Sequence, residues 1–228
     1  MPQYYSVAIA AIYALIGFLP LAGRNIRRPW LWVSLTAGII AGFFAREAVK
    51  LAAEALAPYT LIATGPTATV VNLVIAGAVG ELLKVMAPLA IIMLAPTDAG
   101  TGMAYGAAAG AGFGVIVVQQ GVALALGLVG SPFITPASTI VAVAGWFFRV
   151  LPHIVTTGYV ARAGVRGGLG GALLLAMLVQ AALGLVEGLP LLAGIPLGLV
   201  VTALVSIALY VYLWGLRPRA AGESAVGP

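Results

Sequence analysis

The stretch TGMAYGAAAGAGFG, residues 101–114, carries glycines four residues apart: Gly102, Gly106, Gly110 and Gly114. Residues at this spacing are neighbours on the surface of a helix, so the four glycines line one side of it. Small residues at this spacing let a second helix backbone approach closely, and helix association in lipid depends on such contact. The stretch therefore predicts a central, tightly packed membrane helix, but it predicts no chemistry by itself.

The chain on either side of this stretch is apolar enough for a membrane protein. Of its 228 residues, 62% are hydrophobic and 7% are charged, and the mean hydropathy is +1.13. A soluble domain has about 25% charged residues. Apolar runs of about 20 residues, long enough to cross a bilayer, recur where a β-barrel would show short alternating strands. We therefore expect an all-α, polytopic membrane protein that lies in the lipid bilayer.

Turn sequences divide the chain into seven predicted spans. They cover roughly 4–22, 30–56, 68–95, 101–128, 136–163, 168–186 and 191–215. Sequences rich in glycine and proline, such as ATGP at 63–66 and PTDAG at 96–100, lie between them. We expect one transmembrane domain over residues 1–216. The short polar tail over 217–228 is expected to be disordered and cytoplasmic.

The arginines of the loops and tail predict the orientation of the chain in the cell membrane. They fall in the first loop, the fifth loop and the tail: Arg24, Arg27, Arg28, Arg162, Arg166, Arg217 and Arg219. With seven spans, these segments share one side, and the second, fourth and sixth loops have no Lys or Arg. The positive-inside rule then places the N-terminus outside and the C-terminus in the cytoplasm. Since the net charge of +5 comes from these loops, we expect no nucleic-acid partner.

Ionisable side chains occur inside two of the predicted spans. Glu81 and Lys84 are three residues apart in the third span and share a helix face. Arg149 and His153 are four apart in the fifth span, and Thr157 continues their face. A charge at the bilayer centre costs at least ~2.5–3.5 kcal/mol, so these side chains must face protein or water. They predict either a buried ion-pair cluster that holds the helices together or a functional site.

The charges of this cluster do not balance, because Glu81 is one acid beside both Lys84 and Arg149. Either Lys84 is uncharged, or a second acid joins the cluster, or an anion binds there. Gln119 and Gln120 add polar groups in the fourth span, where glutamine more often joins two helices by a hydrogen bond than catalyses a reaction. A single His and no Cys leave little for a metal site, so we expect no metal and no cofactor.

Three segments, in the same order along the chain, resemble PrsW-type intramembrane proteases, which are relatives of the CAAX-prenyl endopeptidases. The segments are GELLK at 80–84, TDAGTGMAYGAAAGAGFGVIVVQQ at 97–120 and RVLPHIVTTGY at 149–159. The part most specific to the family is the spacing of Tyr105, Gly106, Gly112 and Phe113. The resemblance covers about residues 75–165. It implies a polar intramembrane cavity in which Glu81 activates water and His153 assists.

Two positions depart from the family pattern where that pattern has a glutamate. Gly80 stands at the first of them and Val117 at the second. A general base contributes ~10²–10⁴-fold to a rate, so the loss of these carboxylates predicts impaired catalysis. We expect a peptidase-like membrane subunit that acts as a scaffold or binds a transmembrane substrate or partner.

Two alternatives to this function stay open. The first is an active endopeptidase that uses Glu81 and His153, with a supporting polar cluster of Lys84, Arg149, Gln119, Gln120 and Thr157. The second, from a different class of protein, is a small transporter or channel whose polar residues line a pathway.

Overall fold

A computed structural model describes residues 4–56, 66–127, 135–187, 191–192 and 195–217. These residues form the helices α1 (Tyr4–Ala22), α2 (Pro29–Leu56), α3 (Pro66–Leu94), α4 (Ala99–Gly127), α5 (Pro136–Arg166), α6 (Leu169–Glu187) and α7 (Leu197–Gly215). A 3-10 helix, η1 (Gly23–Arg27), joins α1 to α2, and the two-residue strands β1 (Leu191–Leu192) and β2 (Ile195–Pro196) pair antiparallel. All seven α-helices in the described residues are long and apolar enough to cross a membrane. The predicted all-helical, multi-pass fold is confirmed.

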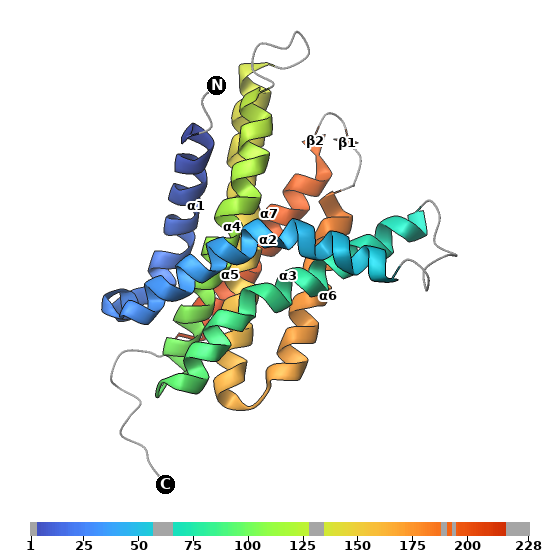
Figure 1. Cartoon of the computed structure of the whole chain (residues 1–228). Helices are drawn as coiled ribbons and strands as arrows, with labels where there is room; N and C mark the ends of the chain where they lie inside the picture. The colour runs from blue at the N-terminus through green and yellow to red at the C-terminus, as the bar shows by residue number, and fades with distance from the viewer. Residues whose placement is uncertain (1–3, 57–65, 128–134, 188–190, 193–194, 218–228) are drawn as a thin grey trace.

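Helix α4 runs through the centre of the molecule, with α1, α2 and α5 packed around it (Figure 1). Every residue from Gly100 to Gly114 is buried. A helix surrounded on all sides needs small side chains, because only these let several neighbouring backbones come close at once. The glycine- and alanine-rich sequence of α4 therefore matches its central place.

The glycines four residues apart on α4 face α5. A Cβ atom on Gly106 would collide with the carbonyl oxygen of Thr157, and one on Gly110 would collide with that of His153. Gly102 faces Val165, whose Cγ2 would lie 2.8 Å from an added Cβ, and Gly114 faces Val150 more loosely. The two backbones are in direct contact over this length. As a result, α5 holds His153 in a fixed position relative to α4.

A second face of α4 packs against α2, which the sequence analysis did not anticipate. A Cβ on Gly38 would collide with the carbonyl of Ala109, and one on Gly112 would collide with the carbonyl of Leu35. Gly42 lies four residues after Gly38, and a Cβ there would be 2.9 Å from the Cβ of Ile116. Small residues thus bring α2 onto α4 in the same way as α5.

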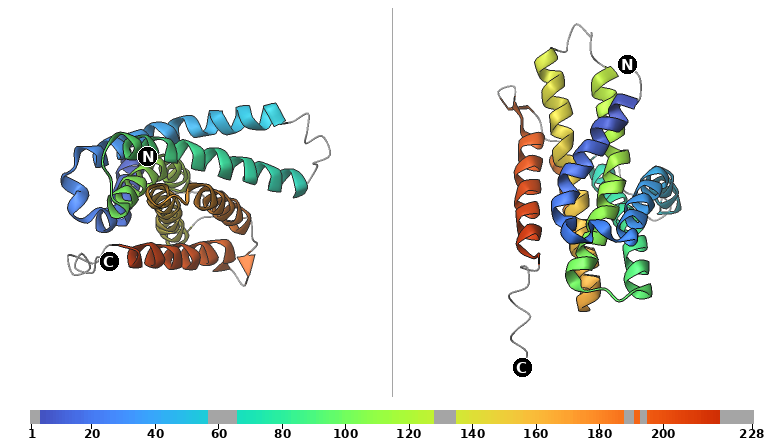
Figure 2. Two further views of the ribbon diagram at one scale, coloured as in Figure 1. Left: turned by 90° about the horizontal axis from the view of Figure 1, so that it is seen from below. Right: turned by 90° about the vertical axis from the view of Figure 1, so that its left-hand side faces the viewer.

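Helices α2 and α3 lie side by side and cross the upright helices α4 and α5 at a large angle (Figure 1, Figure 2). Helix α1 begins at one end of the molecule, and α7 ends at the opposite end (Figure 1). Because α3 leans across the bundle, its middle turns approach both α5 and α6. This arrangement brings the polar residues of α3 against those of α5.

Two predicted helix boundaries are wrong. Helix α7 begins at Leu197 instead of residue 191, because residues 191–192 and 195–196 form the strand pair. Ile195 precedes Pro196, and a residue before proline is driven out of the helical conformation. Helix α5 continues to Arg166 instead of ending at 163, and Gly167, with φ 83°, ends it in the left-handed conformation. The predicted tail lies outside the described residues except for Arg217.

Candidate intramembrane site

Glu81 and Lys84 form a buried ion pair on α3. The Nζ atom of Lys84 donates to Oε1 of Glu81, and the side chain of Lys84 is 1% exposed while that of Glu81 is 0% exposed. An uncompensated charge at such depth costs several kcal/mol, and pairing offsets much of that cost. The chain can therefore carry an acid and a base within this apolar helix.

Lys84 also reaches His153 on α5. Its Nζ lies 3.1 Å from Nδ1 of His153. A charged ammonium group only donates hydrogen bonds, so Nδ1 accepts and the ring proton of His153 is assigned to Nε2. Phe113 of α4 covers this contact, with its ring centroid 5.2 Å from the Lys84 Nζ and 5.2 Å from the His153 ring centroid. The structure thus joins Glu81, Lys84 and His153 in one contact chain.

The threonine that bonds to this cluster is Thr156, and the structure does not join Thr157, which was predicted there, to it by a hydrogen bond. Thr156 Oγ1 lies 2.8 Å from Oε1 of Glu81. Thr157 is buried, and its Oγ1 has no hydrogen-bond partner among the described residues. Successive helix residues point about 100° apart, so one position decides which neighbour a side chain meets. The side chain of Thr156 therefore meets α3, while the backbone carbonyl of Thr157 packs against Gly106 of α4.

Gln180 of α6 is a member of the site that the sequence analysis missed. Its Nε2 donates to Oγ1 of Thr156 at 3.3 Å, which links α6 to the Glu81 cluster. The signal was present in the sequence LLLAMLVQAALGLV, where Gln180 is the polar residue of an otherwise apolar run. A lone glutamine in a span is expected to bond another helix, as this one does.

Two neighbouring cavities open beside the cluster, and His153 and Gln180 line both. The smaller, of about 160 Å³, also contains Glu81, Lys84 and Gly80 in its wall. The larger, of about 430 Å³, lies between α4, α5, α6 and α7. Its polar lining comes from Gln120, Arg149, His153, Gln180 and Thr202. Two adjoining spaces therefore lie beside the residues where the resemblance implies a cavity.

Arg149 is placed in the larger cavity, separate from the ion pair. Its guanidinium carbon lies 3.9 Å from the ring centroid of Trp146, a favourable cation–π distance. Across the cavity, Oγ1 of Thr202 is buried and has no hydrogen-bond partner among the described residues. The larger cavity therefore offers a cation and a hydroxyl group together with the polar side chains of Gln120, His153 and Gln180.

Gln119 lies away from both cavities, and the structure does not bring it to the cluster in which it was predicted. Its Nε2 donates to Oγ of Ser6 on α1 at 3.3 Å. It lines an apolar groove of about 620 Å³ between α1, α2 and α4. Its neighbour Gln120 lies a third of a turn further round α4 and does line the larger cavity. The two glutamines therefore serve different helix contacts.

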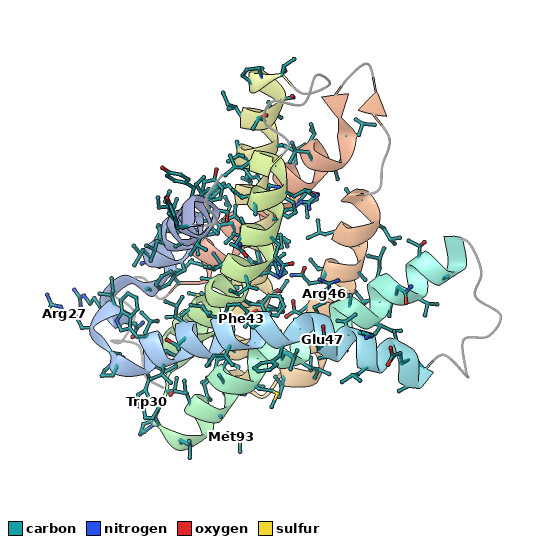
Figure 3. All side chains as sticks on the ribbon, turned by 45° about the horizontal axis from the view of Figure 1, so that its top comes forward. Arg27, Trp30, Phe43, Arg46, Glu47 and Met93 are labelled. Carbon is teal, nitrogen blue, oxygen red and sulfur yellow. The ribbon has the colours of Figure 1, made fainter. Side chains whose placement is uncertain are left out.

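No second acid joins the cluster among the described residues. Glu47 is exposed on α2 (Figure 3). Glu54 is also exposed and pairs with Lys50 at 4.0 Å. Groups of three His, Cys, Asp or Glu side chains that could hold a metal ion are also absent from the described part of the chain. The described residues therefore give no support to the second-acid explanation of the charge imbalance.

Comparisons of the chain with protein-family models, with curated proteins and with solved structures found no match. The functional proposal below therefore depends on the residues of the site and on the three segments quoted above.

Proposed function

We propose that this chain is a peptidase-like membrane protein that binds a transmembrane substrate or partner without cleaving it. The ion pair between Glu81 and Lys84 carries the proposal. A glutamate that acts as general base must take a proton from water. Proton uptake by Glu81 would remove the partner of a Lys84 ammonium that is 1% exposed, and a stranded buried charge is costly. The pair therefore opposes the proton transfer that peptide hydrolysis needs.

The two departures from the PrsW-type pattern support the same proposal. Gly80 lines the smaller cavity and Val117 lines the larger one. In the resemblance, both positions correspond to glutamates. Each cavity therefore has an apolar residue or a glycine at the position where the family pattern supplies a carboxylate.

The larger cavity suits the end of a transmembrane helix. The last four carbonyl groups of any helix lack intrahelical donors, and in lipid they must find donors elsewhere. Arg149, Gln120 and Gln180 offer N–H donors in this cavity. Leu124 and Leu183 add apolar walls for side chains. These groups support binding of the C-terminal end of a helix from a partner protein.

An active endopeptidase is the second candidate, and one observation favours it. The Oε2 atom of Glu81 is buried and has no hydrogen-bond partner among the described residues. Glu81 also lines the smaller cavity, which His153 shares. A water molecule held between this oxygen and the imidazole ring would be placed for activation.

We also propose that the N-terminus lies outside the cell and the C-terminus in the cytoplasm. Arg24 and Arg28 of the first turn line one pocket together with Arg217 after α7. The first loop and the start of the tail therefore lie at the same end of the molecule. Their arginines support the placement of this end on the cytoplasmic side under the positive-inside rule. Arg219 lies outside the described residues.

Peptide binding in nanodiscs tests the proposed function. A fluorescent single-span peptide made of leucine and alanine, with a free C-terminal carboxylate, should bind the purified protein and be recovered intact by mass spectrometry. Gln120→Leu should weaken binding by about three- to tenfold, since a neutral hydrogen bond contributes ~0.5–1.5 kcal/mol. Gln119→Leu is the matched control, because its side chain lies outside the cavity and binds Ser6. Equal affinities for the two variants, or peptide fragments in the wild-type sample, would contradict the proposal.

A further inference from the structure

Three arginines from distant parts of the sequence converge on another pocket, separate from the intramembrane cavities. Arg24 and Arg28 come from the turn between α1 and α2, and Arg217 follows α7. The pocket measures about 460 Å³ and lies at the end of the molecule where α1 and α7 end and α4 begins. The acid in its lining is Asp98. The pocket is therefore strongly basic.

The position of Arg217 depends on a glycine and a tryptophan. Gly23 has φ 52°, and an added Cβ there would lie 3.1 Å from Nη2 of Arg217. The guanidinium carbon of Arg217 also lies 4.3 Å from the ring centroid of Trp214. The bare backbone at Gly23 leaves room for the guanidinium group, and Trp214 supports it by a cation–π contact. Arg217 is thus held against the pocket wall.

Asp98 is occupied with the start of α4. Its Oδ1 accepts from the backbone N–H groups of Gly100 at 2.8 Å and Thr101 at 2.9 Å. Its Oδ2 accepts from the hydroxyl of Thr101 at 2.7 Å. Asp98 forms no salt bridge with an arginine in the described part of the chain. The carboxylate therefore caps the helix, and the guanidinium groups keep most of their capacity for an outside anion.

The aromatic residues around the pocket indicate its depth in the membrane. Trp30 and Trp32 follow Arg28 closely, Trp214 precedes Arg217, and all three tryptophans are exposed. Figure 3 shows Arg27 and Trp30 on the outside of the turn between α1 and α2. Exposed tryptophan beside arginine is typical of the level of lipid headgroups. The pocket therefore opens where the phosphates of a bilayer lie.

We propose that this pocket binds the phosphate of an anionic phospholipid headgroup. Guanidinium groups match phosphate oxygens by paired N–H donors, and basic pockets between membrane helices on the cytoplasmic side bind such headgroups. Bound lipid would bridge the turn after α1 and the end of α7. This binding would stabilise the helix bundle, and it is independent of what the intramembrane cavities hold.

Lipid titration of the full-length protein in neutral detergent tests this proposal, because no charged bilayer surface is then present. Phosphatidylglycerol at saturation should raise the melting temperature by about 5 °C or more. Phosphatidylcholine, and glycerol phosphate at the same concentration, should raise it much less. Replacing Arg24 and Arg217 together by Gln should weaken this binding. The phosphatidylglycerol concentration that gives half of the maximal rise in melting temperature should increase by about tenfold or more.

A matched variant removes the same charge from the same end of the molecule. Arg27 and Arg166 are exposed and do not line the pocket, so Arg27→Gln with Arg166→Gln should leave the titration unchanged. Asp98→Asn keeps a capping side chain but removes the negative charge, so it should tighten binding. The proposal is overturned by equal losses in the two double variants, by an equal response to phosphatidylcholine, or by an equal response to glycerol phosphate. Weaker binding by Asp98→Asn would also overturn it.

Discussion

Glu81 is a carboxylate with no exposed surface, and its direct partners are the Lys84 ammonium and the Thr156 hydroxyl. These partners come from two helices, and Gln180 adds a third helix through Thr156. Removal of one member of a buried polar network leaves its partner buried without a hydrogen bond, so each of these side chains depends on the others. The residues therefore act as one unit in folding.

Glu81→Ala should destabilise the protein by about 3–5 kcal/mol, because it leaves the Lys84 charge buried without its partner. Reversible unfolding in detergent measures this loss. Glu54→Ala is the control, since its pair with Lys50 is exposed and should contribute at most about 0.5 kcal/mol. The double change Glu81→Leu with Lys84→Met should recover much of the loss. Similar stabilities for Glu81→Ala and Glu54→Ala would show that Glu81 does not compensate the buried charge of Lys84.

Asp98 links stability to pH at the start of α4. Burial tends to raise the pKa of Asp98, but hydrogen bonds from Thr101 and Gly100 and the charge of Arg28 outweigh it, and the pKa is lowered. A carboxyl group with a lowered folded-state pKa stabilises the protein above its unfolded pKa and loses this effect as pH falls through the folded pKa. Asp98→Ala should cost about 1 kcal/mol near neutral pH, where the cap is charged. The difference from wild type should shrink as the pH falls below the unfolded value of about 3.9 and through the lowered folded-state pKa, and a constant difference over this fall would contradict the account.

The sequence predicted the ionisable members of the site but not all of their partners. Glu81, Lys84 and His153 were predictable because charge inside a span is costly and needs a protein neighbour. The choice between Thr156 and Thr157 was not, because it depends on which side of α5 faces α3. Gln180 was missed for a similar reason, since the contact between α6 and α5 depends on how the helices pack in three dimensions.

At the level of elements, α4 is packed by small residues on two faces. Gly106 and Gly110 bring α5 close, and Gly112 brings α2 close. The first face was predictable from the spacing of four residues. The second was not, because Gly38 and Gly42 on α2 could face lipid or protein equally well in the sequence alone. A glycine pattern predicts that a helix packs closely but does not say against which partner.

Gly110→Leu should destabilise the protein by about 3 kcal/mol or more, because an added side chain would collide with the backbone of α5 at His153. Thermal unfolding in detergent measures the effect. Gly171→Leu is the matched control on α6, where nothing lies within 4 Å of an added Cβ. The control should be neutral or slightly stabilising, since leucine favours a helix more than glycine. Equal melting temperatures for the two variants would argue against the central packing of α4.

At the level of the whole molecule, hydropathy was sufficient to predict seven long helices, and most of their ends lay within three residues of the observed ones. Hydropathy could not predict that α2 and α3 cross the bundle at a large angle, because helix direction depends on tertiary packing. The arginine pattern predicts which side of the membrane each end faces, and that prediction needs its own experiment.

Single cysteines test the orientation directly, since the natural chain has no cysteine. Ala137→Cys, at the start of α5, should react with an impermeant thiol reagent added outside intact cells. Arg166→Cys, at the other end of α5, should react only after the cells are opened. The reverse pattern would invert the proposed topology, and labelling of both from outside would exclude α5 as a span.

The central claim is that Glu81 holds the fold together and does not catalyse hydrolysis. Turnover of a reconstituted single-span peptide, measured together with melting temperature for the wild type and Glu81→Gln, tests it most directly. The account predicts no cleavage above the rate in empty liposomes for either protein, and a lower melting temperature for the variant because its ion pair is lost. Robust cleavage by the wild type, abolished in Glu81→Gln with the melting temperature unchanged, would contradict the account and make Glu81 a working general base.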